Sequence, residues 1–98
     1  MKEQDNKYAE GLNMFFRLSK DDTRLSATHI SLYVALFRYW LKNNGNSPFK
    51  ITRKAIMTYS KIKSTATYTH CIYDLQTWGY ITYIPSYHPA LGSLVILK

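Results

Sequence analysis

The sequence is poor in cysteine and in long apolar runs, and both shortages narrow what the chain can be. Cys71 is the one cysteine, so no internal disulfide can form, which suits a reducing compartment such as the cytoplasm. The most apolar segment, 30–41, is interrupted by Arg38 and is well short of the roughly 20 residues that span a bilayer. The first eleven residues mix charges and contain no apolar stretch, which is unlike a signal peptide. We therefore expect a cytoplasmic chain without a membrane segment.

Acidic residues are also few, and they are unevenly placed. The chain contains six acidic and thirteen basic residues. Residues 1–25 contain five of each charge, whereas residues 26–98 contain eight bases and a single acid, Asp74. Seven of those bases lie between Arg38 and Lys63 with no acid among them. A surface of one sign favours a polyanion, nucleic acid first and an anionic membrane second; the alternative is a basic surface that only keeps the chain in solution.

Residue patterns that carry catalysis or hold metals are missing as well. Asp21-Asp22 is the only carboxylate pair beyond residue 11, and no histidine or glycine-rich phosphate loop lies near it in sequence. No nucleophile–base motif is recognisable, so we expect no enzyme, no cofactor and no small-molecule ligand. His70, Cys71 and His88 have poor spacing for a metal site, and we interpret Cys71 as a packed thiol.

What remains is enough for one small domain. The 98 residues are 46% hydrophobic and 15% aromatic, with nine tyrosines, so tyrosine rings must supply part of the core. We expect residues 1–11 to be a flexible polar arm and residues 12–98 to form a single domain. Within that domain, Leu12–Leu18 is predicted to be a short strand or an extended segment on the core.

A long helix is predicted over 27–43, with Ser26 as its N-cap. Six positions form the expected core stripe: Ile30, Tyr33, Val34, Phe37, Trp40 and Leu41. Three further apolar residues lie off this stripe: Leu32, Leu36 and Tyr39. The apolar arc is therefore wider than one packed face requires. Either the Leu12–Leu18 segment covers the second side, or a second copy does, which would give a homodimer through helix 27–43.

The second half of the domain predicts two shorter helices followed by a hairpin. Thr52 caps a helix over 53–59, and a turn leads to a helix over 64–78 that ends at Gly79. Buried positions in this pair are expected at Ile56, Tyr59, Ile62, Tyr68, Ile72 and Leu75. The segments 80–84 and 94–97 predict strands, and Phe49–Ile51 a third, short one. The predicted class is α+β: a winged helix-turn-helix with a three-helix core and a small antiparallel sheet.

Two pieces, SKIKSTATYTHCIYDLQTWGYI and RLSATHISLYVALFRYW, resemble small winged-helix transcriptional regulators of bacterial mobile elements and the winged-helix modules of plasmid replication proteins. The resemblance extends from about Phe15 to Lys98. It implies binding of double-stranded DNA, with a role in transcription, excision or replication. It also implies that Ser64, Thr65, Thr67 and His70 lie at the recognition positions. The wing lacks the Arg or Lys that such wings often carry.

We predict a DNA-binding surface built from the basic residues and from the hydroxyl-rich start of helix 64–78. Its members are Arg53, Lys54, Lys61, Lys63, Ser64, Thr65, Thr67, His70, Tyr87 and His88. Hydroxyls contact base edges or phosphates, and the basic side chains contact phosphates. The alternatives are ordinary capping and surface roles, a protein–protein module that uses helix 27–43 without DNA affinity, and RNA binding through exposed tyrosines.

Overall fold

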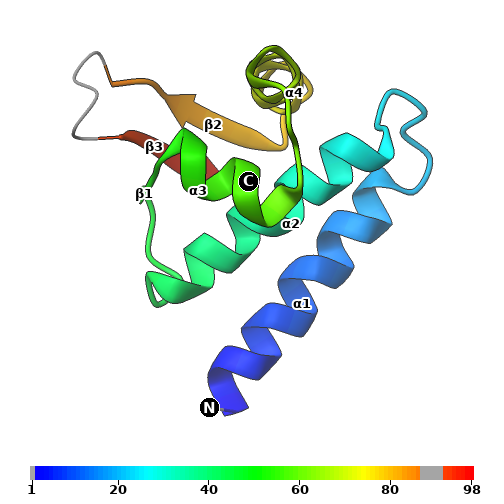
Figure 1. Cartoon of the computed structure of the whole chain (residues 1–98). Helices are drawn as coiled ribbons and strands as arrows, with labels where there is room; N and C mark the ends of the chain where they lie inside the picture. Colours follow the sequence, from blue (N-terminus) through cyan, green and yellow to red (C-terminus); the bar gives the residue numbers. More distant parts are fainter. Residues whose placement is uncertain (1, 87–91) are drawn as a thin grey trace.

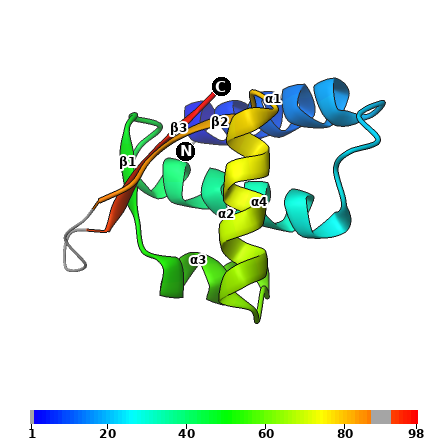
Figure 2. The same cartoon turned by 90° about the horizontal axis from the view of Figure 1, so that it is seen from above.

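A computed structural model describes the backbone of residues 2–86 and 92–98 and the side chains from residue 10 onward within those ranges. The described chain is a small α+β fold of four helices and one three-stranded antiparallel sheet. The elements in order are α1 (Lys2–Ser19), α2 (Ala27–Lys42), β1 (Phe49–Ile51), α3 (Arg53–Ser60), α4 (Thr65–Thr77), β2 (Ile81–Ile84) and β3 (Ser93–Leu97). In Figures 1 and 2, α2 lies between α1 and α3, α4 crosses α2, and the sheet lies to one side.

The first helix corrects two expectations about the N-terminal segment. Residues 2–11, expected as a flexible arm, belong to α1, and Leu12–Leu18 is helical rather than extended. Phe15 is buried and stacks on Tyr33 of α2, with ring centroids 3.8 Å apart. Gly11 permits this close packing, because a Cβ there would lie 2.5 Å from the Phe37 ring. One side of α2 is therefore covered within the chain, by a helix rather than by an extended segment.

The predicted core stripe of α2 is partly wrong. Tyr33 and Phe37 are buried, but the most deeply buried apolar residues of the helix are Leu32 and Leu36, which were placed off the stripe. The other four stripe positions are only partly buried: Ile30, Val34, Trp40 and Leu41. The reason is that α2 packs on several sides, against α1, α3, α4 and β1. Its most buried face is thus set by its neighbours and not by the densest apolar row.

Local end signals fix the three remaining helices where the sequence predicts them. Ser26, Thr52 and Ser64 are the N-caps of α2, α3 and α4, and each side-chain oxygen accepts a hydrogen bond from a backbone N–H of the first turn. Gly79 follows α4 with a φ of 86°. Five of the six buried positions expected for α3, α4 and their turn are buried: Ile56, Ile62, Tyr68, Ile72 and Leu75. The expected burial of Tyr59 is wrong, because this residue is 46% exposed.

The sheet joins a distant strand to the C-terminal hairpin. The strand order is β1-β3-β2, with Phe49 opposite Val95 and Tyr83 opposite the same Val95 from the other side. Phe49, Ile51, Ile81 and Val95 close the core against the helices. The connection between β2 and β3 includes residues 87–91, which lie outside the described residues. No helix in the described ranges combines the length and apolar character needed to cross a bilayer.

Candidate nucleic-acid interface

Eight of the ten predicted site residues gather on one side of the molecule, along α3, the turn and the first half of α4. All eight are exposed: Arg53, Lys54, Lys61, Lys63, Ser64, Thr65, Thr67 and His70. Tyr87 and His88 lie outside the described residues. Lys61 and Lys63 lie beside Ser64 and Thr67 at the start of α4, and Arg53 and Lys54 line a surface with the same two lysines.

The turn between α3 and α4 is held by local hydrogen bonds that leave the basic side chains outside. Lys61 ends α3 in the left-handed conformation, with φ 64°, and the buried Ile62 donates its N–H to Met57 O at 3.2 Å. Ser60 is buried, and its carbonyl accepts a 2.6 Å hydrogen bond from Ser31 Oγ of α2. Because the backbone and Ile62 anchor the turn from within, the ammonium groups on either side of Ile62 remain available to solvent.

The hydroxyls at the start of α4 do not all have the same role. Ser64 Oγ accepts a 3.2 Å hydrogen bond from Thr67 N–H, so its oxygen holds the helix start. Thr65 and Thr67 make no side-chain hydrogen bond within the described part of the chain. Their hydroxyl groups can therefore both donate a hydrogen bond to a ligand and accept one from it. The Ser64 hydroxyl, which already accepts a hydrogen bond, would act mainly as a donor.

The outward face of α4 is larger than the predicted site residues on this helix. Tyr68, Ile72 and Leu75 are buried, and the opposite face of a helix of this period carries Ala66, Thr69, His70 and Tyr73, all exposed. Tyr73 is 45% exposed and contacts the Tyr83 ring edge to face, with centroids 5.7 Å apart. The helical period alone would have placed Ala66 and Tyr73 on this face.

A polar groove runs between α4 and the hairpin. It has a volume of about 510 Å³ and is lined by residues that include Arg53, Lys54, Thr69, Tyr83, Ser86 and Ser93. Gln76 on α4 accepts a 2.6 Å hydrogen bond from the Tyr83 backbone N–H, which fixes β2 against the helix. Cations and hydroxyls around a concave surface are the groups that contact a sugar–phosphate backbone.

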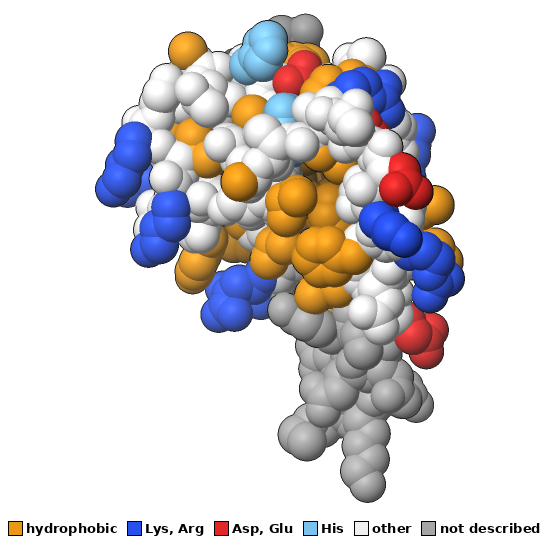
Figure 3. All heavy atoms as spheres, turned by 90° about the vertical axis from the view of Figure 1, so that its right-hand side faces the viewer, with side chains coloured by type: hydrophobic (Ala, Val, Ile, Leu, Met, Phe, Trp, Pro, Cys, Tyr) orange, Lys and Arg blue, Asp and Glu red, His pale blue; other side chains and the backbone are white. Residues whose placement is uncertain are grey.

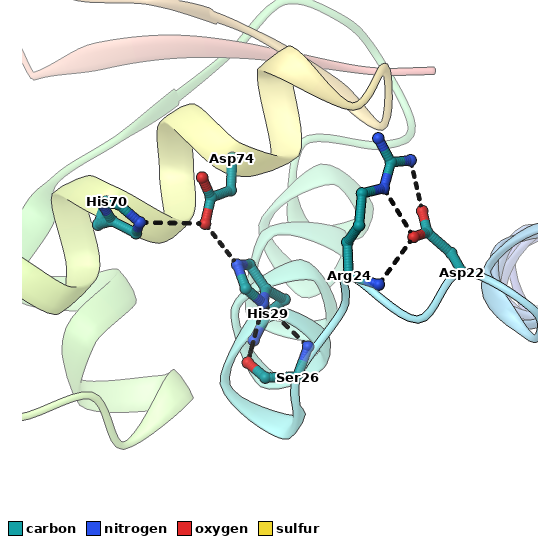
Figure 4. Close-up of polar contacts among 6 residues, drawn as sticks. All are labelled: Asp22, Arg24, Ser26, His29, His70 and Asp74. Carbon is teal, nitrogen blue, oxygen red and sulfur yellow. Dashed lines mark hydrogen bonds and ion pairs between the residues drawn. The ribbon is translucent and has the colours of Figure 1, made fainter.

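The single acid of the second half lies at the edge of this surface, and it is paired. Asp74 Oδ2 lies 2.8 Å from His29 Nε2 and 3.6 Å from His70 Nε2 (Figure 4). His29 Nδ1 accepts hydrogen bonds from the N–H and the hydroxyl of Ser26, so the ring proton lies on Nε2 and is donated to Asp74. This link between α2 and α4 was missed, because His29 and Asp74 are 45 residues apart.

Burial also decides the chemistry of two further α4 side chains. It raises the pKa of the Tyr68 phenol, so this residue stays neutral. Burial, with the Asp74 carboxylate nearby, raises the pKa of the Cys71 thiol, which disfavours the reactive thiolate. Cys71 is 5% exposed, and its interpretation as a packed thiol is confirmed. In residues 10–86 and 92–98, no group of three His, Cys, Asp or Glu side chains gathers around a point that could hold a metal ion.

Comparison with known proteins adds no relative. No family model matches the sequence, and no curated protein or solved structure matches it. Function is therefore inferred from the geometry and charge of the surface around α4.

Proposed function

We propose that this chain is a winged helix-turn-helix that binds double-stranded DNA. In this arrangement α3 and α4 form the helix-turn-helix, α4 enters the major groove, and the β2–β3 hairpin is the wing. The chain order, helix, strand, helix, helix and hairpin, supports the assignment. The additional helix α1 lies against α2, on the opposite side of α2 from α3 (Figure 2).

The observation that carries the proposal is the exposed start of α4, with four exposed cations on α3 and on the turn that leads to it. The side chains of Thr65 and Thr67 are exposed and make no hydrogen bond within the described residues. Lys61 and Lys63 line one surface with Thr67, and the same two lysines line an adjoining surface with Arg53 and Lys54. Threonine hydroxyls and methyl groups contact base edges with modest selectivity, while the cations contact phosphates in any sequence. Sequence preference is therefore expected to depend more on α4 than on the basic side chains.

The biological role proposed with it is regulation of transcription, excision or replication of a mobile element. This part depends on the resemblance of the helix-turn-helix and hairpin segments to such regulators. In this role the protein acts by occupying DNA or by recruiting another protein, without catalysis and without a cofactor.

Fluorescence anisotropy with labelled duplexes tests the proposal directly. Thr67→Glu places a carboxylate on the proposed groove-facing helix and should lower duplex affinity about tenfold or more, because like charges are brought together. Thr23→Glu is the matched control, since it makes the same charge change at an exposed threonine in the α1–α2 loop and should leave affinity nearly unchanged.

Selection from random duplexes would then give the preferred site. Absence of duplex binding at low salt would leave a protein–protein module as the function. Preference for single strands or RNA over duplex, unaffected by Thr67→Glu, would indicate binding of unpaired bases instead.

A further inference from the structure

A second concave surface lies between α2 and α3, away from the start of α4. It has a volume of about 590 Å³. Val34, Ala35 and Leu41 form its apolar floor, and Arg38, Lys42 and Tyr59 form its walls. We call it the α2–α3 groove. Figure 3 shows the face of the molecule seen from the right-hand side of Figure 1, on which hydrophobic side chains gather in a patch with Lys and Arg side chains to either side.

The walls of the α2–α3 groove are held in place by contacts between cations and aromatic rings. The Arg38 guanidinium lies 5.4 Å from the centroid of the Tyr59 ring, and Lys42 Nζ lies 5.2 Å from that of Tyr39. Tyr39 and Tyr59 meet edge to face at 5.8 Å. Such contacts reduce the freedom of long side chains while their charged heads stay solvated. Arg38 and Lys42 are both exposed, so the groove presents two ordered positive charges.

We propose that the α2–α3 groove binds an acidic amphipathic segment of another protein. Apolar side chains of the segment would pack on Val34 and Leu41, and its carboxylates would pair with Arg38 and Lys42. Amphipathic helices bind apolar grooves in this way, with complementary charges at the rim. An exposed tyrosine and arginine beside an apolar floor are also the residue types that contribute most to protein interfaces.

Charge argues against a second copy of this chain as the occupant. A two-fold contact centred on the groove would bring Arg38 and Lys42 of both copies together, and like charges disfavour it. None of the four acids among the described side chains, Glu10, Asp21, Asp22 and Asp74, lines the groove. The positive walls therefore require carboxylates from a different molecule.

The apolar floor argues against nucleic acid as the occupant. Phosphates would pair with Arg38 and Lys42 but would leave Val34 and Leu41 facing a charged backbone. None of the eight described residues of the candidate DNA surface lines the α2–α3 groove. DNA and an acidic segment would therefore bind at separate places, and the test of one is independent of the test of the other.

Titration of the full 98-residue chain with synthetic peptides tests the proposal. The probes are a 14-residue helical peptide with a Leu/Phe stripe and flanking Glu residues, and the same peptide with Lys in place of each Glu. Two-dimensional NMR should show saturable shifts at Val34, Ala35 and Leu41 with the acidic peptide alone. In the variant Arg38→Glu with Lys42→Glu, affinity should fall about tenfold or more, since two attractive pairs become repulsive.

A matched variant separates the local effect from net charge. Lys50→Glu with Lys98→Glu changes the net charge equally at two exposed positions outside the groove and should leave peptide affinity within about twofold. The groove variant should keep duplex binding, which also shows that it is folded; its circular dichroism spectrum and melting temperature serve the same purpose if duplex binding is absent from the parent.

Four outcomes would overturn the proposal. They are no groove shifts with the acidic peptide, equal binding of the lysine peptide, dimerisation of the parent that Arg38→Glu abolishes, and loss of duplex binding in the groove variant. The last two would assign the surface to a second copy and to nucleic acid, respectively. Failure of the DNA proposal would remove only the last of these readouts, since the peptide titrations and the dimerisation measurement contain no DNA.

Discussion

His29 on α2 donates a hydrogen bond from Nε2 to Asp74 on α4, at 2.8 Å. The other ring nitrogen of His29 accepts from Ser26, so the same imidazole completes the N-cap of α2 and holds α4. His29 is 7% exposed, and water competes little for this bond. The rotation of α4 about its axis, and therefore which residues face outward, depends on this contact as well as on the apolar core.

Removing the buried imidazole should destabilise the fold more than removing the exposed one. His29→Ala removes the acceptor of the Ser26 N–H and the 2.8 Å partner of Asp74, and we expect the free energy of unfolding to fall by roughly 1–3 kcal/mol. His70→Ala is the matched control, because His70 faces the same carboxylate at 3.6 Å with its side chain 79% exposed; its effect should be below about 0.5 kcal/mol. Urea unfolding measures both, and equal losses would contradict the assignment.

Thr67→Glu should change stability and DNA affinity in opposite directions. Residue 67 is the third residue after the Ser64 cap, where a glutamate completes a capping box and interacts favourably with the helix dipole. We expect the free energy of unfolding to rise by roughly 0.3–1 kcal/mol, measured by thermal or urea unfolding. A loss of duplex binding in this variant is then not attributable to unfolding. A fall in stability would contradict the capping geometry.

The end signals made the second half of the fold predictable from sequence. Thr52, Ser64 and Gly79 act on their own helix turns, so no distant contact is needed to place α3 and α4. The exposed cations are predictable for a similar reason, since long charged side chains rarely lie buried without a partner. Most of the candidate DNA surface therefore follows from local patterns.

The structure of α1 and α2 was harder to predict from sequence, because contacts between residues distant in sequence determine it. Gly11 lowers helix propensity, yet α1 continues through it, and the Phe37 ring occupies the space where a Cβ would lie. The spacing of Leu12, Phe15 and Ser19 fits a helical face, and that signal was available. The burial of Leu32 and Leu36 depends on several neighbours of α2 at once, and the pairing of His29 with Asp74 spans two helices; neither leaves a local pattern.

Two glycines with positive φ should respond differently to alanine. Gly79 has open space around it, so Gly79→Ala adds mainly backbone strain, about 1 kcal/mol. At Gly92 a Cβ would lie 2.5 Å from Ile51 O, where β3 meets β1. Gly92→Ala adds a clash with the backbone to the same strain, and the loss should reach at least about 2 kcal/mol. Urea unfolding of the pair measures the difference, and equal losses would contradict the close approach at Gly92.

Acid should weaken the contact between Asp22 of the α1–α2 loop and Tyr80, which directly precedes β2. Hydrogen bonds from Arg24 and then from Tyr80 lower the pKa of Asp22 below its ordinary value of 3.8. A lowered folded-state pKa means that Asp22 stabilises the fold above about pH 3.8 and loses this contribution as the pH falls further. Asp22→Asn should therefore melt below the parent at pH 5–8, and the gap should close in acid. A gap independent of pH would contradict this linkage.

Duplex affinity should fall steeply with salt. Arg53, Lys54, Lys61, Lys63 and the nearby Lys50 offer about five phosphate contacts, which gives a slope of log affinity against log salt near −4 to −5. Lys61→Gln should make the slope shallower by about one. Lys20→Gln, at an exposed position in the α1–α2 loop, should leave it unchanged. Anisotropy titrations at several salt concentrations measure this, and a flat dependence would contradict phosphate contacts.

Because Gly11 has no side chain, its contact with Phe37 also limits how many N-terminal residues can be removed from a folded fragment. Because the α1 backbone approaches the Phe37 ring so closely, Phe15 can stack on Tyr33 at 3.8 Å and also meet Tyr80 at 5.6 Å. Removal of residues 1–19 would expose the rings of both Tyr33 and Phe37 to water. The smallest fragment that folds cleanly therefore begins upstream of Gly11, although the proposed helix-turn-helix begins only at α3.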